Sequence, residues 1–531
     1  MSRFTDQIYN ASTVNGLTVG EPEQPRRSTW ADIHRDARHV AGGLAERQIG
    51  PGCVAAVLVG CPGDVARVVQ ACWMRRTAVT MVQPPTPRST RAIWLEDTAR
   101  TLHAIGAEIL VLAEPYTLSG DEDFPCPAVT VDELQKSSPT CPLEAVESDN
   151  ALLQLTSGST GSAKAVVVTH QNLYAGTLAV RDGMALTAVD CAIFWLPLFH
   201  DMGMIAMLLT PMQYGVETIG ITPTDFMRDP LLWLELISRH RGTVTAGPNF
   251  SFGLVARRLA GLPDGAYDLS SLRFAAIGAE PINPATIDEF VTQGIRHGLN
   301  PTAMVPSYGL AEATLVVTLA RGTGTVTDEP LPAVPEDRDP PRRYVRLGWP
   351  VTGLEMRVVS DSGEPVTARI VGEVEIRGEA VTACYVTGKG ELPTQHGDGW
   401  LATGDLGYLT EDGQLVICGR SKDTIIIAGR NFYPTDIERI CERVADVRPN
   451  NVVAIKLDTA SGEGFAIVAE SHRVQDVQAN RTIRLQIATL LQRELGITPK
   501  NIVVLPPNTI PKTTSGKLRR TESRTLLSTS F

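Results

Sequence analysis

The chain has 531 residues, and this length predicts two or more domains rather than a single hydrophobic core. Hydrophobic residues make up 43% of the chain and charged residues 20%, which argues against an intrinsically disordered protein. The formal net charge of −11 argues against nucleic-acid binding, because a phosphate backbone requires a basic surface. It does not exclude a small nucleotide held by a few local cations.

The sequence carries no signal for a membrane or for export. No apolar run reaches the roughly 18 residues of a membrane span, so no integral membrane association is expected. Residues 1–10 hold no apolar signal core, and the nine cysteines form no Cys-x-x-Cys pair, which together favour a cytoplasmic protein. The GxSxG, HExxH and GxGxxG signatures are absent, which argues against the enzyme classes that they mark.

The first two thirds of the chain predict an α/β fold. Residues 53–59 and 106–112 are short apolar, β-branched runs typical of buried strands, and the segment from Asp64 to Arg75 has the length of a helix. This alternation predicts α/β layers with a largely parallel sheet. Farther on, segments 355–366 and 372–378 alternate with glycine-containing turns, which indicates a small antiparallel sheet or barrel.

The end of the chain predicts a small α+β domain. Thr435 and Glu438 match a capping box, so a helix is expected to start there and to run toward Val444. Two strands and a longer helix are expected beyond it, at 451–457, 464–469 and 475–495.

Two domains are therefore expected, at residues 1–421 and 422–531. The segment 321–343 is rich in proline and charge, and it predicts an extended surface insertion in the first domain.

Residues 154–170, QLTSGSTGSAKAVVVTH, place a loop rich in serine, threonine and glycine between two predicted strands, 151–156 and 165–170. Glycines let successive backbone N–H groups converge on an anion, and Lys164 can reach distal phosphates. The loop is not a Walker loop, because alanines flank the lysine and a strand follows where a helix should start. A flexible loop without a ligand is the alternative.

Four later motifs place this loop in a known context: PSYGLAEAT (306–314), WLATGDLGYL (400–409), GRSKDTIIIAGRNFYPTDIE (419–438) and PKTTSGKLRR (511–520). In this order they resemble the adenylate-forming (ANL) superfamily of acyl-CoA synthetases, peptide-synthetase adenylation domains and luciferases. The resemblance covers residues 150 to 520. The loop departs from the superfamily at Ala163-Lys164-Ala165, where Pro-Lys-Gly is common.

Three further segments, 194–205, 246–254 and 278–282, resemble the fatty acyl-AMP ligases. This resemblance implies ATP- and Mg²⁺-dependent activation of a long-chain fatty acid, followed by acyl transfer to the phosphopantetheine arm of an acyl carrier protein. The insertion of such ligases hinders the use of coenzyme A, but here it is short, so a fatty acyl-CoA ligase remains an alternative. The compact insertion and short tail look most like the ligases of mycobactin-type siderophore clusters, which suggests lipid or siderophore synthesis.

The resemblance also implies the catalytic groups. A carboxylate is already ionised at neutral pH, so attack on the α-phosphorus needs cations rather than a general base. Lys517 is expected to bridge the carboxylate and the α-phosphate, and Glu312 to hold Mg²⁺. His200 is expected to lie between the nucleotide and the acyl tunnel in a positioning role, and a packed core histidine is the alternative. Lys422 matches the hinge about which a mobile C-terminal domain turns.

The same resemblance implies the nucleotide contacts. Asp405 is expected to accept the ribose hydroxyls, with Arg420 and Arg430 on the ribose and phosphate sides. The pyrophosphate portion is expected to contact Thr156, Ser157, Gly158, Ser159, Thr160, Gly161 and Lys164. The adenine is expected near Gly278, Ala279, Glu280, Ser307, Tyr308 and Gly309. The apolar segment 203–212 is expected either to line the acyl tunnel or to belong to an ordinary core.

Two further hypotheses for the function stay open. A nucleotide- or acyl-binding protein without catalysis could retain the fold, although the joint presence of Lys164, Glu312, Asp405 and Lys517 argues against it. The other alternative is an aryl- or amino-acid-adenylating enzyme, because the residue that would contact the ammonium group of an amino-acid substrate is not located in the sequence.

Overall fold

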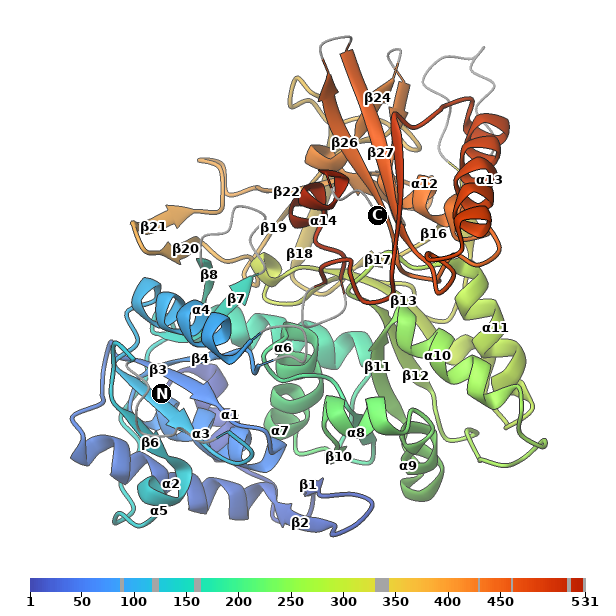
Figure 1. The fold of residues 1–531 in the computed structure, drawn as a ribbon. Coiled ribbons are helices and arrows are strands. Elements are labelled where there is room, and N and C mark those ends of the chain that lie inside the picture. The colour runs from blue at the N-terminus through green and yellow to red at the C-terminus, as the bar shows by residue number, and fades with distance from the viewer. Residues whose placement is uncertain are drawn as a thin grey trace. The chain divides into compact units, whose positions relative to one another are not determined.

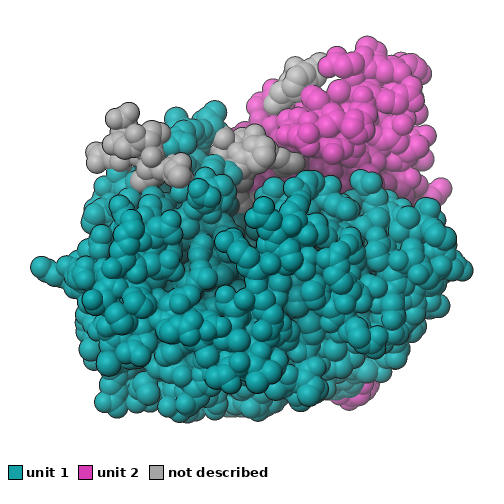
Figure 2. Space-filling view, turned by 90° about the horizontal axis from the view of Figure 1, so that it is seen from below, with its two compact units in different colours: residues 1–325, 348–355, 376–401 teal, residues 326–347, 356–375, 402–531 magenta. Residues whose placement is uncertain are grey.

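The computed structural model describes residues 1–85, 90–116, 124–156, 164–329, 343–427, 430–459, 462–512 and 517–528 (Figure 1). The chain divides into two compact units, coloured separately in Figure 2. Unit 1 consists of residues 1–325, 348–355 and 376–401, and unit 2 of residues 326–347, 356–375 and 402–531. The expected domain boundary between residues 421 and 422 stays a prediction. Most of the expected insertion, 330–342, lies outside the described residues.

Unit 1 contains two large mixed sheets. The first has nine strands, in the order β17 (Trp349–Pro350), β14 (Val316–Leu319), β13 (Met304–Gly309), β12 (Phe274–Gly278), β11 (Val244–Pro248), β9 (Cys191–Phe194), β10 (Glu217–Gly220), β1 (Gly16–Val19) and β2 (Arg26–Thr29). Neighbouring strands from β13 to β1 are parallel, and the strands at both ends pair antiparallel.

The second sheet has eight strands, in the order β21 (Gly390–Pro393), β20 (Cys384–Thr387), β8 (Lys164–Thr169), β7 (Asn150–Thr156), β4 (Ala78–Met81), β3 (Val54–Leu58), β5 (Ile109–Leu112) and β6 (Ala128–Thr130). The strands from β7 to β6 are parallel, whereas β7, β8, β20 and β21 pair antiparallel. The expected α/β class with largely parallel sheets is confirmed, and β3, β5, β7 and β8 correspond to the four strands predicted in this region.

Helices complete unit 1. They are α1 (Arg3–Tyr9), α2 (Trp30–Glu46), α3 (Pro62–Met74), α4 (Arg91–Ala104), α5 (Val131–Gln135), α6 (His170–Met184), α7 (Thr210–Tyr214), α8 (Pro223–Arg228), α9 (Leu232–His240), α10 (Asn249–Leu259) and α11 (Pro284–Ile295). Helix α3, the predicted helix, is almost wholly buried, and its Trp73 indole donates to the Ala151 carbonyl of β7. Asp64 and Arg67 form an ion pair on one side of this helix, and its buried apolar residues belong to the core. None of the described helices is both long and apolar enough to span a bilayer.

The described part of unit 2 combines small sheets with three α-helices. Its strands are β15 (Thr327–Asp328), β16 (Tyr344–Val345), most of the four-stranded sheet β18 (Leu354–Val359), β19 (Gly372–Gly378), β22 (Leu401–Leu409) and β23 (Leu415–Arg420), the pair β24 (Ile425–Ile427) and β25 (Arg430–Phe432), and the sheet β26 (Val452–Thr459), β27 (Gly462–Glu470) and β28 (Asn501–Leu505). Its helices are α12 (Pro434–Cys441), α13 (Val477–Leu495) and α14 (Arg520–Ser523). The two strands and the long helix predicted after residue 450 are present within a few residues.

The predicted capping box at Thr435 and Glu438 is wrong. Helix α12 begins at Pro434, with Tyr433 as its N-cap and no side-chain cap, so Thr435 lies inside the first turn. Proline at the first helical position fixes a suitable φ and needs no N–H partner, which explains the earlier start. The Glu438 side chain is buried and makes longer-range contacts instead.

The apolar segment predicted at 203–212 forms an unusual helix. Residues Met202–Leu209 make a π-helix, η1, whose side chains are all buried, and α7 continues it. Gly203 allows the close approach of this segment to the preceding turn, because a Cβ there would lie 2.3 Å from the Pro197 carbonyl oxygen. The rare π form often occurs at functional sites. The role of η1 as part of an acyl tunnel stays a prediction.

Candidate active site

The predicted phosphate loop begins and ends at one point of the eight-stranded sheet. Thr156, the last residue of β7, pairs with Lys164, the first residue of β8. The predicted loop residues Ser157, Gly158, Ser159, Thr160 and Gly161 lie outside the described residues. The antiparallel pairing therefore fixes the two borders of the loop, and it sets the side chain of Lys164 at the start of a strand.

One tyrosine joins Lys164 to Glu312. Tyr385 lies on β20, the neighbour of β8, and Lys164 Nζ lies 3.9 Å from the centre of its ring. The Tyr385 hydroxyl donates a hydrogen bond of 2.6 Å to Glu312 Oε1. An ammonium over an aromatic face and a hydroxyl donating to a carboxylate are both favourable contacts. The structure therefore brings two predicted site residues to opposite parts of one side chain.

The backbone around Glu312 is attached to the same region. Glu312 lies in the short helix η3 (Ala311–Ala313), which follows β13 of the nine-stranded sheet. Its carbonyl accepts a hydrogen bond of 2.8 Å from the Thr382 N–H, on the segment that leads into β20. Thr314 has a φ of +63°, and its hydroxyl donates to the Ala380 carbonyl at 2.7 Å. A positive φ is unfavourable for threonine, so these bonds offset a strained turn at the site.

The residues predicted near the adenine lie at the carboxyl ends of two parallel strands, β12 and β13. A Cβ at Gly278 would lie 2.6 Å from Ser307 Oγ, so only glycine fits between the strands. Ala279 follows with a φ of +63°, while Tyr308 and Gly309 complete β13. Ligands of α/β proteins commonly bind at the carboxyl ends of such strands. These residues and Glu312 therefore occupy one edge of the sheet.

Glu280 makes a contact that the sequence did not predict. One of its carboxylate oxygens accepts the Phe250 N–H at 2.7 Å, where α10 begins. The first N–H groups of a helix lack partners within it and carry partial positive charge, so a carboxylate is favourable there. The contact of Glu280 with a nucleotide stays a prediction.

His200 lies in a loop attached to the phosphate-loop strand. His200 Nδ1 is 2.6 Å from Asp201 Oδ1, and both side chains are largely buried. The side-chain amide of Gln154, on β7, donates to the Phe199 carbonyl at 2.9 Å. The imidazole is therefore oriented by its neighbour and fixed to the strand that ends at Thr156, as a positioning residue would be.

In unit 2, Asp405 and Arg420 are brought together by β22 and β23. The two residues are register partners, and Arg420 Nε lies 3.1 Å from Asp405 Oδ1. Asp405 is buried, whereas the Arg420 side chain is 56% exposed, so this ion pair stabilises the fold by less than about 1 kcal/mol. Lys422 lies two residues beyond Arg420, in the short helix η4 (Ser421–Asp423).

Arg430 and Lys517 lie elsewhere in unit 2. Arg430 is the first residue of β25, and its guanidinium carbon lies 5.0 Å from the centre of the Phe432 ring. Lys517 precedes Leu518, which forms an antiparallel bridge with Lys512. Both residues were predicted as site residues from the family motifs alone, because the periodicity of the sequence gives no indication of their role.

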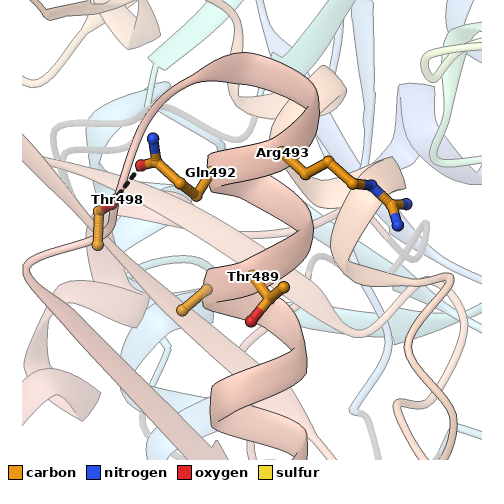
Figure 3. Close-up of a pocket in the computed structure, with 5 residues that line it drawn as sticks. Thr489, Gln492, Arg493 and Thr498 are labelled. Carbon is orange, nitrogen blue, oxygen red and sulfur yellow. Dashed lines mark hydrogen bonds between the residues drawn. The ribbon is translucent and has the colours of Figure 1, made fainter.

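A hollow on α13 is not a candidate site. It is open to solvent and is lined by Ala488, Thr489, Gln492, Arg493 and Thr498 (Figure 3). Thr498 donates a hydrogen bond of 2.8 Å to Gln492 across one side of it. The hollow contains no predicted site residue.

Glu312 is the predicted metal ligand. The described residues contain no cluster of three or more His, Cys, Asp or Glu side chains that could hold a metal ion. Mg²⁺ typically binds one or two carboxylates together with phosphates and water. Glu312, an oriented carboxylate at the strand ends, fits that mode of binding.

Comparison with known proteins agrees with this geometry. The model of the AMP-binding enzyme family matches residues 11–386, which include the nine-stranded sheet, most of the eight-stranded sheet and the contacts around Tyr385. The chain belongs to this family, and it is an adenylate-forming ligase of the ANL superfamily that uses ATP.

Particular relatives extend the match over the whole chain. Rv1013 of Mycobacterium tuberculosis, which carries the provisional name of a ligase, is 46% identical over 543 residues, covering 99% of this chain and 100% of its own. The medium-chain-fatty-acid–acyl-carrier-protein ligase JamA of Moorena producens is 32% identical, covering 70% and 67%. A protein of Mycobacterium leprae with the provisional name of fatty-acid–CoA ligase is 33% identical, covering 70% and 69%.

A solved structure is similar as well. It comes from a study of fatty acyl-adenylate ligases from E. coli and L. pneumophila, and it is 28% identical with a TM-score of 0.88, covering 99% of this chain and 98% of its own.

Proposed function

We propose that this protein activates a long-chain fatty acid with ATP, giving acyl-AMP and pyrophosphate, and then transfers the acyl group to the phosphopantetheine thiol of an acyl carrier protein. The family supports adenylate formation. The similarity to a fatty acyl-adenylate ligase and to JamA supports the acid and the acceptor. A role in lipid or mycobactin-like siderophore synthesis is part of this proposal. So is a cytoplasmic location, to which nine free thiols are suited.

The observation that carries the proposal is the contact of Lys164 and Glu312 with Tyr385. It presents an ammonium and a carboxylate together beside the strand ends, within the region that matches the family. A polyphosphate needs fixed positive charge, and its metal ion needs a carboxylate. Both groups are oriented before a ligand binds, which lowers the reorganisation that the reaction requires.

The chemistry follows from charge. One oxygen of the fatty carboxylate forms a bond to the α-phosphorus, the bond to the pyrophosphate oxygen breaks, and no proton is transferred. Glu312 would hold Mg²⁺, which supplies positive charge to the phosphate oxygens when bound. Lys164 would hold the distal phosphates. Lys517 would neutralise the oxygens that gather around the α-phosphorus, where negative charge increases.

The other predicted residues keep their proposed roles. Asp405 would accept the ribose hydroxyls, Arg420 and Arg430 would flank the ribose and phosphates, and His200 would orient the acid. The region 422–531 would turn at Lys422 between the two half-reactions.

Exchange of labelled pyrophosphate into ATP tests adenylation. We expect exchange that depends on an added fatty acid, with a chain-length optimum among long chains. The Lys517→Ala variant should lose about 10²-fold or more of this rate, as when one fixed donor to a developing charge is removed. Lys500→Ala, at an exposed lysine of the same unit, is the control. Undiminished exchange by Lys517→Ala, or no exchange with any carboxylic acid, would contradict the proposal.

Coenzyme A is the second candidate acceptor, and the fatty-acid–CoA ligase name among the relatives favours it. The acceptors are separated by following radiolabelled acyl groups with coenzyme A or with a phosphopantetheinylated carrier protein. We expect transfer to the carrier protein. Prompt formation of acyl-CoA would instead identify a fatty acyl-CoA ligase.

A further inference from the structure

Lys517 lies beside a point where two described parts of the chain are joined. Lys512 and Leu518 form an antiparallel bridge, and the Arg519 N–H donates to the Pro511 carbonyl at 3.0 Å. The described residues on the two sides of this bridge are therefore joined, and the place of Lys517 depends on what holds each side.

The entering end is held by a buried carboxylate on β27. Glu470 Oε1 accepts the N–H groups of Thr509 and Ile510, each at 2.8 Å. Its other oxygen lies 2.5 Å from Arg448 Nη1, and the Glu470 side chain is fully buried. Two backbone amides and a guanidinium thus fix this carboxylate, and the carboxylate fixes the two residues that precede Pro511.

The leaving end is held by a second buried carboxylate, on α12. Arg520 Nη2 lies 2.8 and 2.7 Å from the two oxygens of Glu438. Glu438 also accepts the Ala454 N–H of β26 at 2.9 Å, and its side chain is 8% exposed. Burial raises the pKa of Glu438, and the charge of Arg520 opposes that shift. The residue three positions beyond Lys517 is therefore tied to both a helix and a strand.

We propose that Glu438 and Glu470 are positioning residues for Lys517, and that the Glu438–Arg520 pair sets the place of its amine during adenylation. This inference rests on the proposed role of Lys517. Each of these two anchors restricts the conformations open to the described residues beside Lys517 before the nucleotide binds. A misplacement of about 1 Å can cost on the order of 10²-fold in rate, so anchors remote from the chemistry affect it.

The test removes the pair without leaving a buried charge. In the double variant Glu438→Gln with Arg520→Met, the glutamine amide oxygen keeps the Ala454 partner and the methionine keeps the volume. We expect kcat for fatty-acid-dependent pyrophosphate exchange to fall by about tenfold or more, with KM for ATP unchanged. Arg520→Lys should retain most of the rate, because one nitrogen of Arg520 contacts both oxygens and an ammonium can replace it.

A second assay supplies acyl-AMP and measures acyl transfer to the acceptor that the wild type uses. It separates a loss of Lys517 positioning from general damage to the fold. This half-reaction does not use the Lys517 amine, so the double variant should retain it. Arg443→Met is the matched control, because Arg443 also extends from the α12 region to a glutamate, Glu494, but its pair is exposed and does not hold the loop. An equal loss of exchange and transfer, or a rate unchanged by the double variant, would overturn the inference.

The Lys517→Ala background distinguishes failure of the positioning inference from failure of the proposed function. If Lys517→Ala alone leaves exchange intact, the proposed role of Lys517 is wrong. If Lys517→Ala abolishes most of the exchange, removing the Glu438–Arg520 pair should cause no further loss, since residues that act through one group are not additive. A further loss of exchange in this background would mean that the Glu438–Arg520 pair stabilises the fold in general and does not act through Lys517. Arg520→Lys keeps the comparison possible if the double variant folds poorly.

Discussion

Lys164 and Glu312 in unit 1 are held in a different way from Lys517 in unit 2. In unit 1, Lys164 and Glu312 contact the same side chain, Tyr385, so the proposed site residues support one another. In unit 2, the loop of Lys517 is held by Glu438 and Glu470, carboxylates with no proposed contact to substrate.

Substitutions should therefore lower activity in different ways in the two units. The unit 1 groups lie at the ends of sheet strands, whose positions are set by the core, and one neighbouring side chain, Tyr385, orients both of them. The unit 2 lysine lies on a loop, and a loop needs anchors from the neighbouring helix and strands. Substitutions in unit 1 should therefore act directly on the chemistry, whereas in unit 2 buried residues away from the chemistry should matter as well.

The largest expected effect is at Glu312. Glu312→Ala removes the proposed metal ligand and should lower the exchange rate by about 10²-fold or more, because fixed charge at the phosphates is lost. The Mg²⁺ concentration for half-maximal rate should rise. Glu289→Ala, at an exposed glutamate of α11, is the control. If Glu312→Ala behaved like this control, the direct role of the unit 1 group would be rejected.

Tyr385 gives a graded test of the unit 1 contacts. Tyr385→Phe keeps the ring under Lys164 but removes the hydroxyl that orients Glu312, and exchange should fall by about tenfold, as expected for one hydrogen bond to a charged group. Tyr385→Leu removes both contacts and should lose more. Tyr267→Phe, at a tyrosine away from the proposed site, is the control for the loss of a tyrosine hydroxyl. Equal rates for the Phe and Leu variants would mean that the ring contact with Lys164 has no part in the reaction.

Local patterns predicted most of the fold, and long-range contacts account for what they missed. Strands such as β3 and β5 follow from apolar β-branched runs. Tyr385 could not be identified as a site residue, because the residue it bonds, Glu312, is 73 positions away. The capping box failed for the same reason: Glu438 matched a local pattern but serves Ala454 and Arg520, at separations of 16 and 82 residues.

A smaller effect is expected where unit 2 spans the proposed hinge. The Tyr344 hydroxyl donates to Asp436 Oδ2 at 2.6 Å, and these residues lie on opposite sides of Lys422 in the chain. A turn at Lys422 would separate them, so the bond stabilises one orientation. Tyr344→Phe should change the rates of the two half-reactions by a few-fold in opposite directions. The control is Tyr408→Phe, in the same cluster, because the buried Tyr408 hydroxyl has no partner among the described residues. Changes of the same sign would argue against the hinge.

The smallest expected effects concern pH, and they have opposite signs in the two units. In unit 1, burial lowers the pKa of His170 to about 4 from an ordinary value of 6.5. The unfolded chain therefore binds the proton first, and stability is lost as the pH falls from about 6.5 to 4. In unit 2, burial raises the pKa of Glu442 to about 7 from 4.5. Here the folded state keeps the proton up to a higher pH than the unfolded chain does. The contribution of Glu442 to stability is therefore present below pH 4.5 and is lost as the pH rises toward 7.

Thermal unfolding of two variants measures these contributions. His170→Phe removes the titrating group from a pocket that already contains Phe4 and Trp73, and Tm should fall less steeply below pH 6.5 than in the wild type. Glu442→Gln keeps an oxygen for the Asn450 N–H, and it should remove the part of the loss that occurs between pH 4.5 and 7. Each change should be on the order of a few degrees. Parallel Tm–pH curves for variant and wild type would show that the group titrates alike in both states, and the contrast between the units would not extend to their response to pH.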